Sequence, residues 1–453
     1  MQGVAYLLDM PSLSIDPRKF IGPPFTSCPK CERQEFGALT ISKTSVTRRC
    51  RECWHTETQV LPALHKKIVY LDQMVYSGMA KTLDPVWAAA SAPQGGFWGK
   101  AFDALERAFK LQLIVCPNST VHEKESALAS QPPMLRALYE HLGNGTSFQY
   151  PVIIHQQQLS VALRAVLQGE APHYDLRRGL VMYGDPDEWM DRLRISVNLS
   201  AARPDAKTER GVRDRSFDAM LKYFEQWQTE KGKKFDDWYR PQRQSYAVYF
   251  AHLFNQHNAL MQRVYAGEIR MTEEVVFPRL EVGLLLALLH VAKDTGEGRG
   301  TPLEIVSAFL FSDAAYDAPA NDTSALLLAA VARKAASGQR RPPSPGMWND
   351  IVAISSFLPY CDAMFLDNEC AGLMREEPLK TKLGHFGTRI FSSRTGDAFL
   401  EYLDSLERHA GADHVRLVAE VYGDDWSVPY RELLIHARER EARHSESRRI
   451  TPP

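Results

Sequence analysis

Two pairs of cysteines near the start of the chain have the spacing of metal ligands. Cys28 and Cys31 form one Cys-x-x-Cys pair, Cys50 and Cys53 form another, and eighteen residues separate the pairs. Each such turn can present two thiolates to one ion, and two turns complete the tetrahedral set of a structural Zn²⁺ site. The pattern therefore predicts one bound zinc and a reducing compartment, not a disulfide framework.

The segment between the two pairs contains two strand-like stretches, 38–41 and 45–47, which predict a β-hairpin. Two Cys-x-x-Cys turns joined by a hairpin resemble a zinc ribbon, and we expect this domain to span residues 1–62. Lys43, Arg48, Arg49 and Arg51 make the segment basic. Nucleic-acid contact, a protein partner and a solvated surface are all open as explanations of that charge.

A second group of reactive residues is acidic and lies at or near the ends of apolar stretches. The apolar residues 68–71 precede Asp72, and a strand predicted over 361–366 precedes Asp367. Short apolar runs suit strands buried in a parallel sheet, whose carboxyl ends share the edge where ligands bind. An acid at that edge either caps the next helix or belongs to a site.

The helix that follows the strand predicted at 113–116 offers two glutamates. Val121, Glu125 and Leu128 recur with helical spacing, so Glu125 is expected to face the sheet. Glu123 instead fits a capping box with Thr120. The sequence alone does not decide which glutamate is the second acid, and we choose Glu125.

His122 lies between the predicted cap and Glu125. It is our candidate for substrate contact, and simple packing is the alternative.

Asp350, at the start of the helix before the third strand, completes a set of four carboxylates with Asp72, Glu125 and Asp367. Four carboxylates packed together raise one another's pKa, and divalent cations relieve the repulsion. Mg²⁺ and Mn²⁺ prefer such oxygen ligands, and two ions about 3.5–4 Å apart can activate water and stabilise the leaving oxygen in phosphodiester cleavage. The sequence contains no Walker lysine loop, Gly-x-Ser-x-Gly elbow or His-Glu-x-x-His motif.

Strands and helices alternate through 63–150 and again through 346–412, which predicts a parallel, doubly wound sheet. Residues 151–345 read as helices without that alternation, so we expect a large all-α insertion between two halves of one α/β domain. Residues 413–453 are expected to form a helical or disordered tail, because Arg431 to Arg449 mix Arg and Glu over few apolar residues.

The acids in this order resemble those of the PIN-like nuclease superfamily. The resemblance rests on Val-Tyr-Leu-Asp72, on Glu-Lys-Glu125 after the second strand, and on Asn-Asp350 followed seventeen residues later by Phe-Leu-Asp367. It covers about 66–142 and 345–408, and the helical insertion departs from a compact PIN domain. It implies a PIN-like fold and a metal-dependent endonuclease, usually acting on RNA, with the four acids as Mg²⁺ or Mn²⁺ ligands.

Asp362 also resembles an acid common near this strand. It lies five residues before Asp367, about 16 Å along an extended strand, so the two cannot easily share an ion.

Within the insertion, basic residues between 207 and 243 are interleaved with Trp227, Trp238 and Tyr239. Basic and aromatic side chains together can hold single-stranded nucleic acid. We expect Lys231, Lys233 and Lys234 to contact substrate, with a solvated helical face as the alternative.

The 453 residues suffice for two or three domains, and the net charge of −1 gives no global sign of nucleic-acid binding. No signal peptide or bilayer-length apolar run is visible, so we expect a cytoplasmic protein without a membrane partner.

Together these features predict a metal-dependent endonuclease, with RNA preferred over DNA as the expected substrate. A fused zinc ribbon and a large insertion suggest, by analogy only, a toxin-like or phage-defence role. The alternative is a catalytically silent adaptor that binds nucleic acid or protein on a PIN-like scaffold. Convergence of the four acids within a few ångströms would favour the enzyme.

Overall fold

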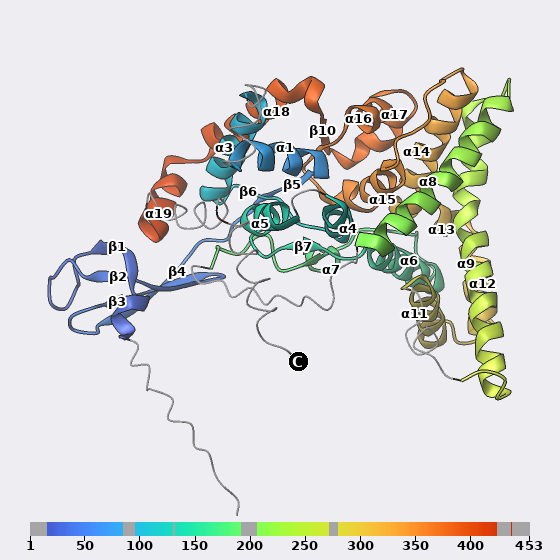
Figure 1. The fold of residues 1–453 in the computed structure, drawn as a ribbon. Coiled ribbons are helices and arrows are strands. Elements are labelled where there is room, and N and C mark those ends of the chain that lie inside the picture. The colour runs from blue at the N-terminus through green and yellow to red at the C-terminus, as the bar shows by residue number, and fades with distance from the viewer. Residues whose placement is uncertain are drawn as a thin grey trace, which may run out of the picture. The chain divides into compact units, whose positions relative to one another are not determined.

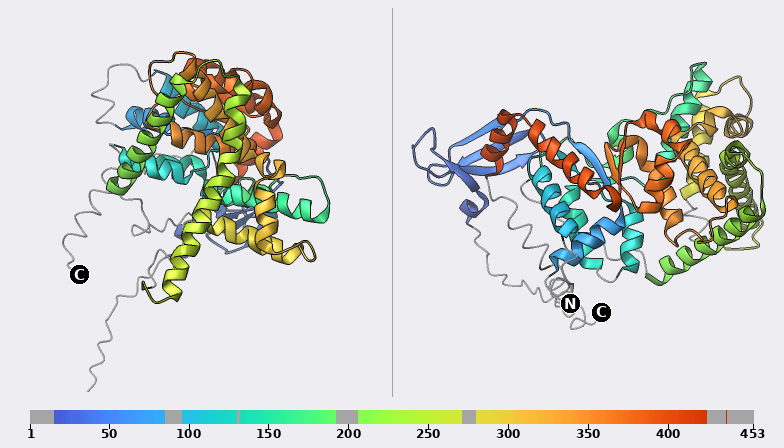
Figure 2. Two further views of the ribbon diagram at one scale, coloured as in Figure 1. Left: turned by 90° about the vertical axis from the view of Figure 1, so that its right-hand side faces the viewer. Right: turned by 90° about the horizontal axis from the view of Figure 1, so that it is seen from above.

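A computed structural model of the chain describes residues 16–84, 96–129, 132–191, 206–270 and 280–423, and residue 436. These residues form a mixed α/β protein that is mostly helical, with one small parallel sheet and antiparallel sheets (Figures 1 and 2). The chain divides into two compact units, of which the first comprises Met1–Leu64, Asp187–Val197 and Ala410–Pro429. The remaining residues form the second unit.

The first unit contains a four-stranded antiparallel sheet in the order β1-β2-β3-β4. Its strands are β1 (Gly22–Thr26), β2 (Phe36–Ser42), β3 (Ser45–Cys50) and β4 (Thr56–Val60). The expected hairpin is β2–β3, with Ser42 opposite Ser45. The sequence had not indicated the outer strands β1 and β4.

Two distant segments join this sheet in the first unit, so the unit is larger than the expected domain 1–62. The helix α19 (Ala412–Tyr422) lies where we expected a helical or disordered tail. The hydroxyl of Tyr422 donates to the carbonyl of Met190 at 2.8 Å, and the guanidinium of Arg48 donates to the carbonyl of Glu420. The predicted tail from 424 onward, apart from residue 436, lies outside the described residues.

The second unit is built on a parallel sheet in the order β10-β9-β5-β6. Its strands are β5 (Lys67–Leu71), β6 (Ile114–Val115), β9 (Ala363–Phe365) and β10 (Arg389–Phe391). The strands β5, β6 and β9 coincide with predicted strands. Leu71 pairs with Phe365, and Phe365 with Phe391, so three strands reach their carboxyl ends at the same level.

Short helices follow and precede these strands. They are α1 (Gln73–Leu83), α3 (Gly96–Lys110), α4 (Thr120–Leu128), α5 (Pro132–Gly143), α15 (Met347–Phe357), α16 (Asn368–Arg375), α17 (Leu379–Leu383) and α18 (Gly396–His409).

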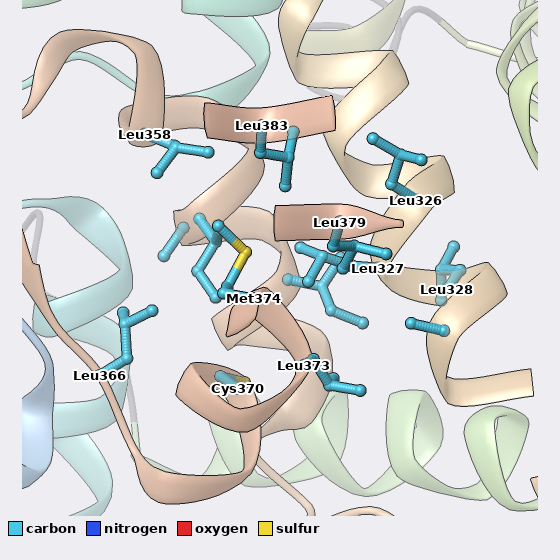
Figure 3. Packing of buried hydrophobic residues seen from close by; sticks show 14 of the residues in the cluster. Leu326, Leu327, Leu328, Leu358, Leu366, Cys370, Leu373, Met374, Leu379 and Leu383 are labelled. Carbon is cyan, nitrogen blue, oxygen red and sulfur yellow. The ribbon is translucent and has the colours of Figure 1, made fainter. Parts of the chain in front are cut away.

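The segment between the two halves is helical, as predicted, but it shares the core of the sheet. Its main helices are α6 (Pro151–Gln168), α8 (Ala206–Thr229), α9 (Phe235–Tyr265), α11 (Leu280–Thr295), α12 (Pro302–Leu310) and α14 (Pro319–Ala336). Figure 3 shows Leu326, Leu327 and Leu328 of α14 among the leucines of α16 and α17. The expected boundary at 345 therefore cuts through a common core, and the insertion is not a separate unit.

No helix in the described ranges combines the length and the apolar character needed to cross a bilayer.

Candidate metal centres

The four cysteines of the first unit lie in one cluster whose geometry suits a tetrahedral ion. The Sγ atoms of Cys28 and Cys53 are 3.5 Å apart, and those of Cys31 and Cys50 are 3.6 Å apart. All four Sγ atoms lie within 4.8 Å of one another. Zn–S bonds of about 2.3 Å at tetrahedral angles give S···S separations of roughly 3.8 Å, so zinc fits this cluster.

The two cysteine turns have the same local geometry. The backbone N–H of Lys30 points at the Sγ of Cys28, and that of Glu52 at the Sγ of Cys50, each at 3.4 Å. Each turn ends in a residue with positive φ, Glu32 at 59° and Trp54 at 60°. Amides directed at sulfur favour thiolates, which are the form that binds zinc.

The second cluster begins with Asp72 and Asp367, which follow the adjacent parallel strands β5 and β9. The Oδ1 of Asp72 accepts from the N–H of Met74 at 3.1 Å, and the Oδ1 of Asp367 accepts from the N–H of Cys370 at 2.6 Å. Each aspartate is therefore the N-cap of the following helix. The Oδ2 of Asp72 also accepts from the N–H of Asp367 at 3.2 Å, so capping holds both carboxylates at one sheet edge.

Asp350 of α15 lies near Asp367, whereas Glu125 of α4 is connected to the group through Asn349 and through charge interactions with Asp72 and Asp350. The side-chain amide of Asn349 donates to the Oε1 of Glu125 at 3.1 Å, which ties the start of α15 to α4. Asp350, Asp367 and Cys370 present ligand atoms within 4.8 Å of one another. Burial raises the pKa of the Cys370 thiol well above its usual range, so this sulfur is a poor candidate ligand.

Burial is the main cause of the raised pKa of Asp72, Glu125 and Asp350, and neighbouring carboxylates add to it. Burial and the charge of Asp72 raise the pKa of Glu125 to about 7. Burial and the charge of Asp367 raise the pKa of Asp72 to about 6. Burial, followed by Asp72, Glu125 and Asp367, raises the pKa of Asp350 well above its ordinary value.

All four residues are partly exposed. Without a cation the centre retains protons near neutral pH, and a divalent ion would displace them. The donor set of hard oxygens fits Mg²⁺ or Mn²⁺.

Glu123 lies outside this cluster and is exposed. The predicted capping box is wrong, because the N-cap of α4 is Ser119, whose Oγ accepts from the N–H of His122 at 3.3 Å. With the helix starting at Thr120, Glu123 is one residue too far along to close that box.

His122 is not placed where substrate could touch it, because its side chain is 0% exposed. Its Nε2 donates to the carbonyl of Leu71 at 2.8 Å, which leaves Nδ1 to accept from the Ser119 hydroxyl at 3.2 Å. Burial lowers its pKa to about 4, so the ring stays neutral. We therefore correct our expectation: His122 braces the end of β5 immediately before Asp72.

The three lysines of the insertion lie at the turn from α8 to α9, outside the carboxylate cluster. Lys231 donates to the carbonyl of Ala336 at 3.1 Å. Lys233 pairs with Glu230 and lies 4.5 Å from the ring centroid of Trp238. Lys234 is exposed at the start of α9. Their contact with nucleic acid stays a prediction.

Asp362 lies at the opposite end of the strand from the acids. Its Oδ1 accepts from the Nζ of Lys67 at 2.8 Å and its Oδ2 from the N–H of Ile68 at 2.9 Å. This placement agrees with our expectation, from the length of the strand, that Asp362 and Asp367 do not share an ion.

Sequence reasoning missed two contributors, Asn349 and Glu369. Glu369 lies in the first turn of α16, where burial and Asp367 raise its pKa, opposed by Lys334 and Arg341. The only sign in the sequence was their position: Asn349 directly precedes Asp350, and Glu369 lies two residues after Asp367.

Comparison of the chain with protein-family models, with curated proteins and with solved structures found no match. Any functional conclusion therefore rests on the chemistry of the two centres.

Proposed function

We propose that this protein is a metal-dependent endonuclease, with RNA preferred over DNA as substrate, built on a PIN-like scaffold. One observation carries the proposal: carboxylates from four separate elements, Asp72, Glu125, Asp350 and Asp367, interact at the carboxyl edge of a parallel sheet. Burying four acids together costs stability, so the arrangement indicates a ligand that repays it, and a divalent cation is the ligand of matching chemistry.

The chain's own residues would divide the work as follows. Asp72 and Asp367, fixed as helix caps, would hold Mg²⁺ or Mn²⁺, and Asp350 would complete the set of ligands. Asn349 would orient Glu125 by its hydrogen bond. A bound cation would supply Lewis acidity and a lowered pKa for water, the chemistry that phosphodiester hydrolysis needs.

The zinc ribbon would have a structural role and would position nucleic acid or a protein partner. Arg49 stacks over the ring of Trp54, with its guanidinium 4.6 Å from the centroid, so a basic and aromatic surface lies beside the cysteines. A cytoplasmic setting would keep the thiols reduced, and a toxin-like or phage-defence role belongs to the same proposal.

The test is incubation of the zinc-loaded protein with end-labelled RNA and DNA, each with Mn²⁺, with Mg²⁺, or with no added divalent ion. We expect internal cleavage that needs the ion and that is lost in Asp350→Asn. If the wild type cleaves neither substrate with either ion, the protein is not this enzyme and the adaptor becomes the better account.

A further inference from the structure

One buried tyrosine joins the residues that directly follow Asp72 and Glu125. Tyr139 of α5 is 2% exposed, and its hydroxyl donates to the side-chain carbonyl of Gln73, the residue after Asp72. The same hydroxyl lies 2.7 Å from the hydroxyl of Ser126, the residue after Glu125. Because the single proton of the Tyr139 hydroxyl is donated to Gln73, Ser126 is the donor in the second bond. One side chain therefore connects the start of α1 to α4.

His122 adds a second connection from the same face of α4. It lies four residues before Ser126, so the two side chains are neighbours on the helix surface. The imidazole stacks on the ring of Tyr139, with centroids 5.1 Å apart and 22° between the planes, and its Nε2 donates to the carbonyl of Leu71. The chain is thus held immediately before Asp72 by His122 and immediately after it by Tyr139.

These connections determine where α4 presents Glu125. The carboxylate of Glu125 accepts from Asn349 of α15, a contact separate from that of Ser126. The backbone of Glu125 moves with α4, and Ser126 ties α4 to Tyr139. Side chains that bind a metal must be held within about 0.5 Å of their productive geometry. A small shift of α4 would therefore change how well Glu125 can act together with Asp72.

We propose that Tyr139 is a positioning residue of the carboxylate cluster. Its hydrogen bonds to Gln73 and Ser126 fix the separation of Asp72 and Glu125 and thereby set the affinity of the cluster for a divalent cation. The inference rests on the proposed function, because it gives Tyr139 a role at the metal centre on which cleavage would depend.

The experiment measures Mn²⁺ binding to the zinc-loaded protein by electron paramagnetic resonance, without nucleic acid. Tyr139→Phe removes only the hydroxyl. Ser126→Ala breaks only the bond to α4, so the test does not depend on the folding of a single variant. Each change is also made in a Glu125→Gln background, which separates an effect through Glu125 from a general loss of packing. Melting temperatures without Mn²⁺ show which variants are folded.

A matched control comes from the same aromatic group. Tyr76 of α1 is fully buried and packs edge-on against Tyr139, with ring centroids 4.5 Å apart. Its hydroxyl has no hydrogen-bond partner among the described residues. Tyr76→Phe therefore removes the same chemical group from the same cluster without breaking a connection between α1 and α4.

The loss of a partner that orients metal ligands typically reduces metal affinity, so Tyr139→Phe should weaken Mn²⁺ binding about 10- to 100-fold. Ser126→Ala should also weaken it, whereas Tyr76→Phe should bind Mn²⁺ as the wild type does. In the Glu125→Gln background, Tyr139→Phe should change Mn²⁺ affinity by less than about threefold, because the effects of residues that act through one another do not add.

The inference is overturned if the wild type binds no Mn²⁺, or if Tyr139→Phe and Ser126→Ala bind it as tightly as the wild type. It is also overturned if Tyr76→Phe shows the same loss, or if Tyr139→Phe weakens binding equally in both backgrounds.

Failure of this inference is distinct from failure of the nuclease proposal. A wild type that shows the expected coupling but cleaves neither RNA nor DNA would reject only the enzyme. Cleavage that needs Mn²⁺, together with equal Mn²⁺ affinity in the wild type and Tyr139→Phe, would reject only the positioning role of Tyr139.

Discussion

At the scale of single residues, the two aspartates at the strand ends are helix caps, which was one of the two roles that the sequence left open. Asp72 and Asp367 cap α1 and α16 and also lie against each other. Capping uses one carboxylate oxygen of Asp367, so the second stays available to a ligand. A helix cap that follows a parallel strand would therefore hold the proposed metal ligand in place with no additional side chain.

The two glutamates of α4 form a natural pair for mutation. Glu125→Gln removes the charge next to Asp72 and Asp350 but keeps the volume, so cleavage should fall by at least about 100-fold while the fold is retained. Glu123→Gln, on the exposed side, should keep wild-type activity. Initial cleavage rates in Mn²⁺ and melting temperatures of both variants decide this. An active Glu125→Gln together with an inactive Glu123→Gln would reverse the assignment.

The raised pKa values predict how the metal-free protein responds to pH. Glu125 has a folded pKa of about 7 against an ordinary 4.5, and Asp72 about 6 against 3.8. A carboxyl group whose pKa is higher in the folded than in the unfolded protein stabilises the fold at pH values below its unfolded pKa. This stabilisation is lost as the pH rises through the folded pKa. Between about pH 5 and pH 8 the melting temperature should therefore fall more in the wild type than in Glu125→Gln.

Taking the difference between the two proteins cancels the titrating groups that do not interact with Glu125, among them the buried His122. Added Mn²⁺ should flatten the wild-type decline. Parallel curves for the two proteins would show that Glu125 does not carry the raised pKa.

At the scale of elements, the apolar periodicity was enough to place the strands of the parallel sheet and most helices. The strands predicted at 68–71, 113–116 and 361–366 overlap β5, β6 and β9. The errors concern tertiary contacts. The start of α4 at Thr120 moved Glu123 off the cap, and packing against Leu71 and Ser119 buried His122. Neither contact is visible in local sequence.

Helix α14 shows why the domain boundary was misplaced. Fourteen of its residues are buried, many of them alanine, so neighbouring helices approach it from several sides. A helix that is apolar all round belongs to the interior. We assigned α14 to the insertion because strands and helices do not alternate in this part of the sequence. The lack of alternation does not tell which elements the helix packs against.

Two helical glycines test how tightly the sheet is covered. A Cβ on Gly78 of α1 would lie 2.5 Å from the ring of Trp98, whereas a Cβ on Gly283 of α11 meets nothing within 4 Å. Gly78→Ala should cost about 1–3 kcal/mol through overpacking. Gly283→Ala should gain up to about 1 kcal/mol from helix propensity. Chemical denaturation of both variants checks this, and equal shifts would contradict the packing of α1 against α3.

At the scale of the whole molecule, the chain contains two units that differ in the residues that form their cores. The first unit has a small sheet whose cysteine cluster packs with Phe36. The second contains two large apolar clusters among its described residues. The Cys-x-x-Cys spacing predicted the cysteine cluster, but the contributions of residues 187–197 and α19 depend on long-range packing that local patterns do not encode.

Removal of zinc should separate the units experimentally. Protein purified without chelator should contain one zinc per chain, and a strong zinc chelator should open the first unit, because zinc binding supplies much of the folding free energy of such domains. Limited proteolysis should then cut within 27–60 while the second unit survives. Clearly less than one zinc per chain, or a chelated protein with unchanged protease resistance, would argue against a structural zinc.

The central claim is that the four carboxylates form a divalent-cation centre, and Mn²⁺ binding tests it most directly. The free-ion signal in electron paramagnetic resonance counts Mn²⁺ bound to the zinc-loaded protein without any substrate. Asp367→Asn is the sharpest variant, because asparagine also caps helices and so removes the charge while keeping α16 in place. We predict that the wild type binds at least one Mn²⁺ per chain with a Kd below about 1 mM. Asp367→Asn should bind Mn²⁺ at least about tenfold more weakly. The melting temperature of this variant should not fall. Equal Mn²⁺ binding by the wild type and a folded Asp367→Asn, or no binding by either, would contradict the account.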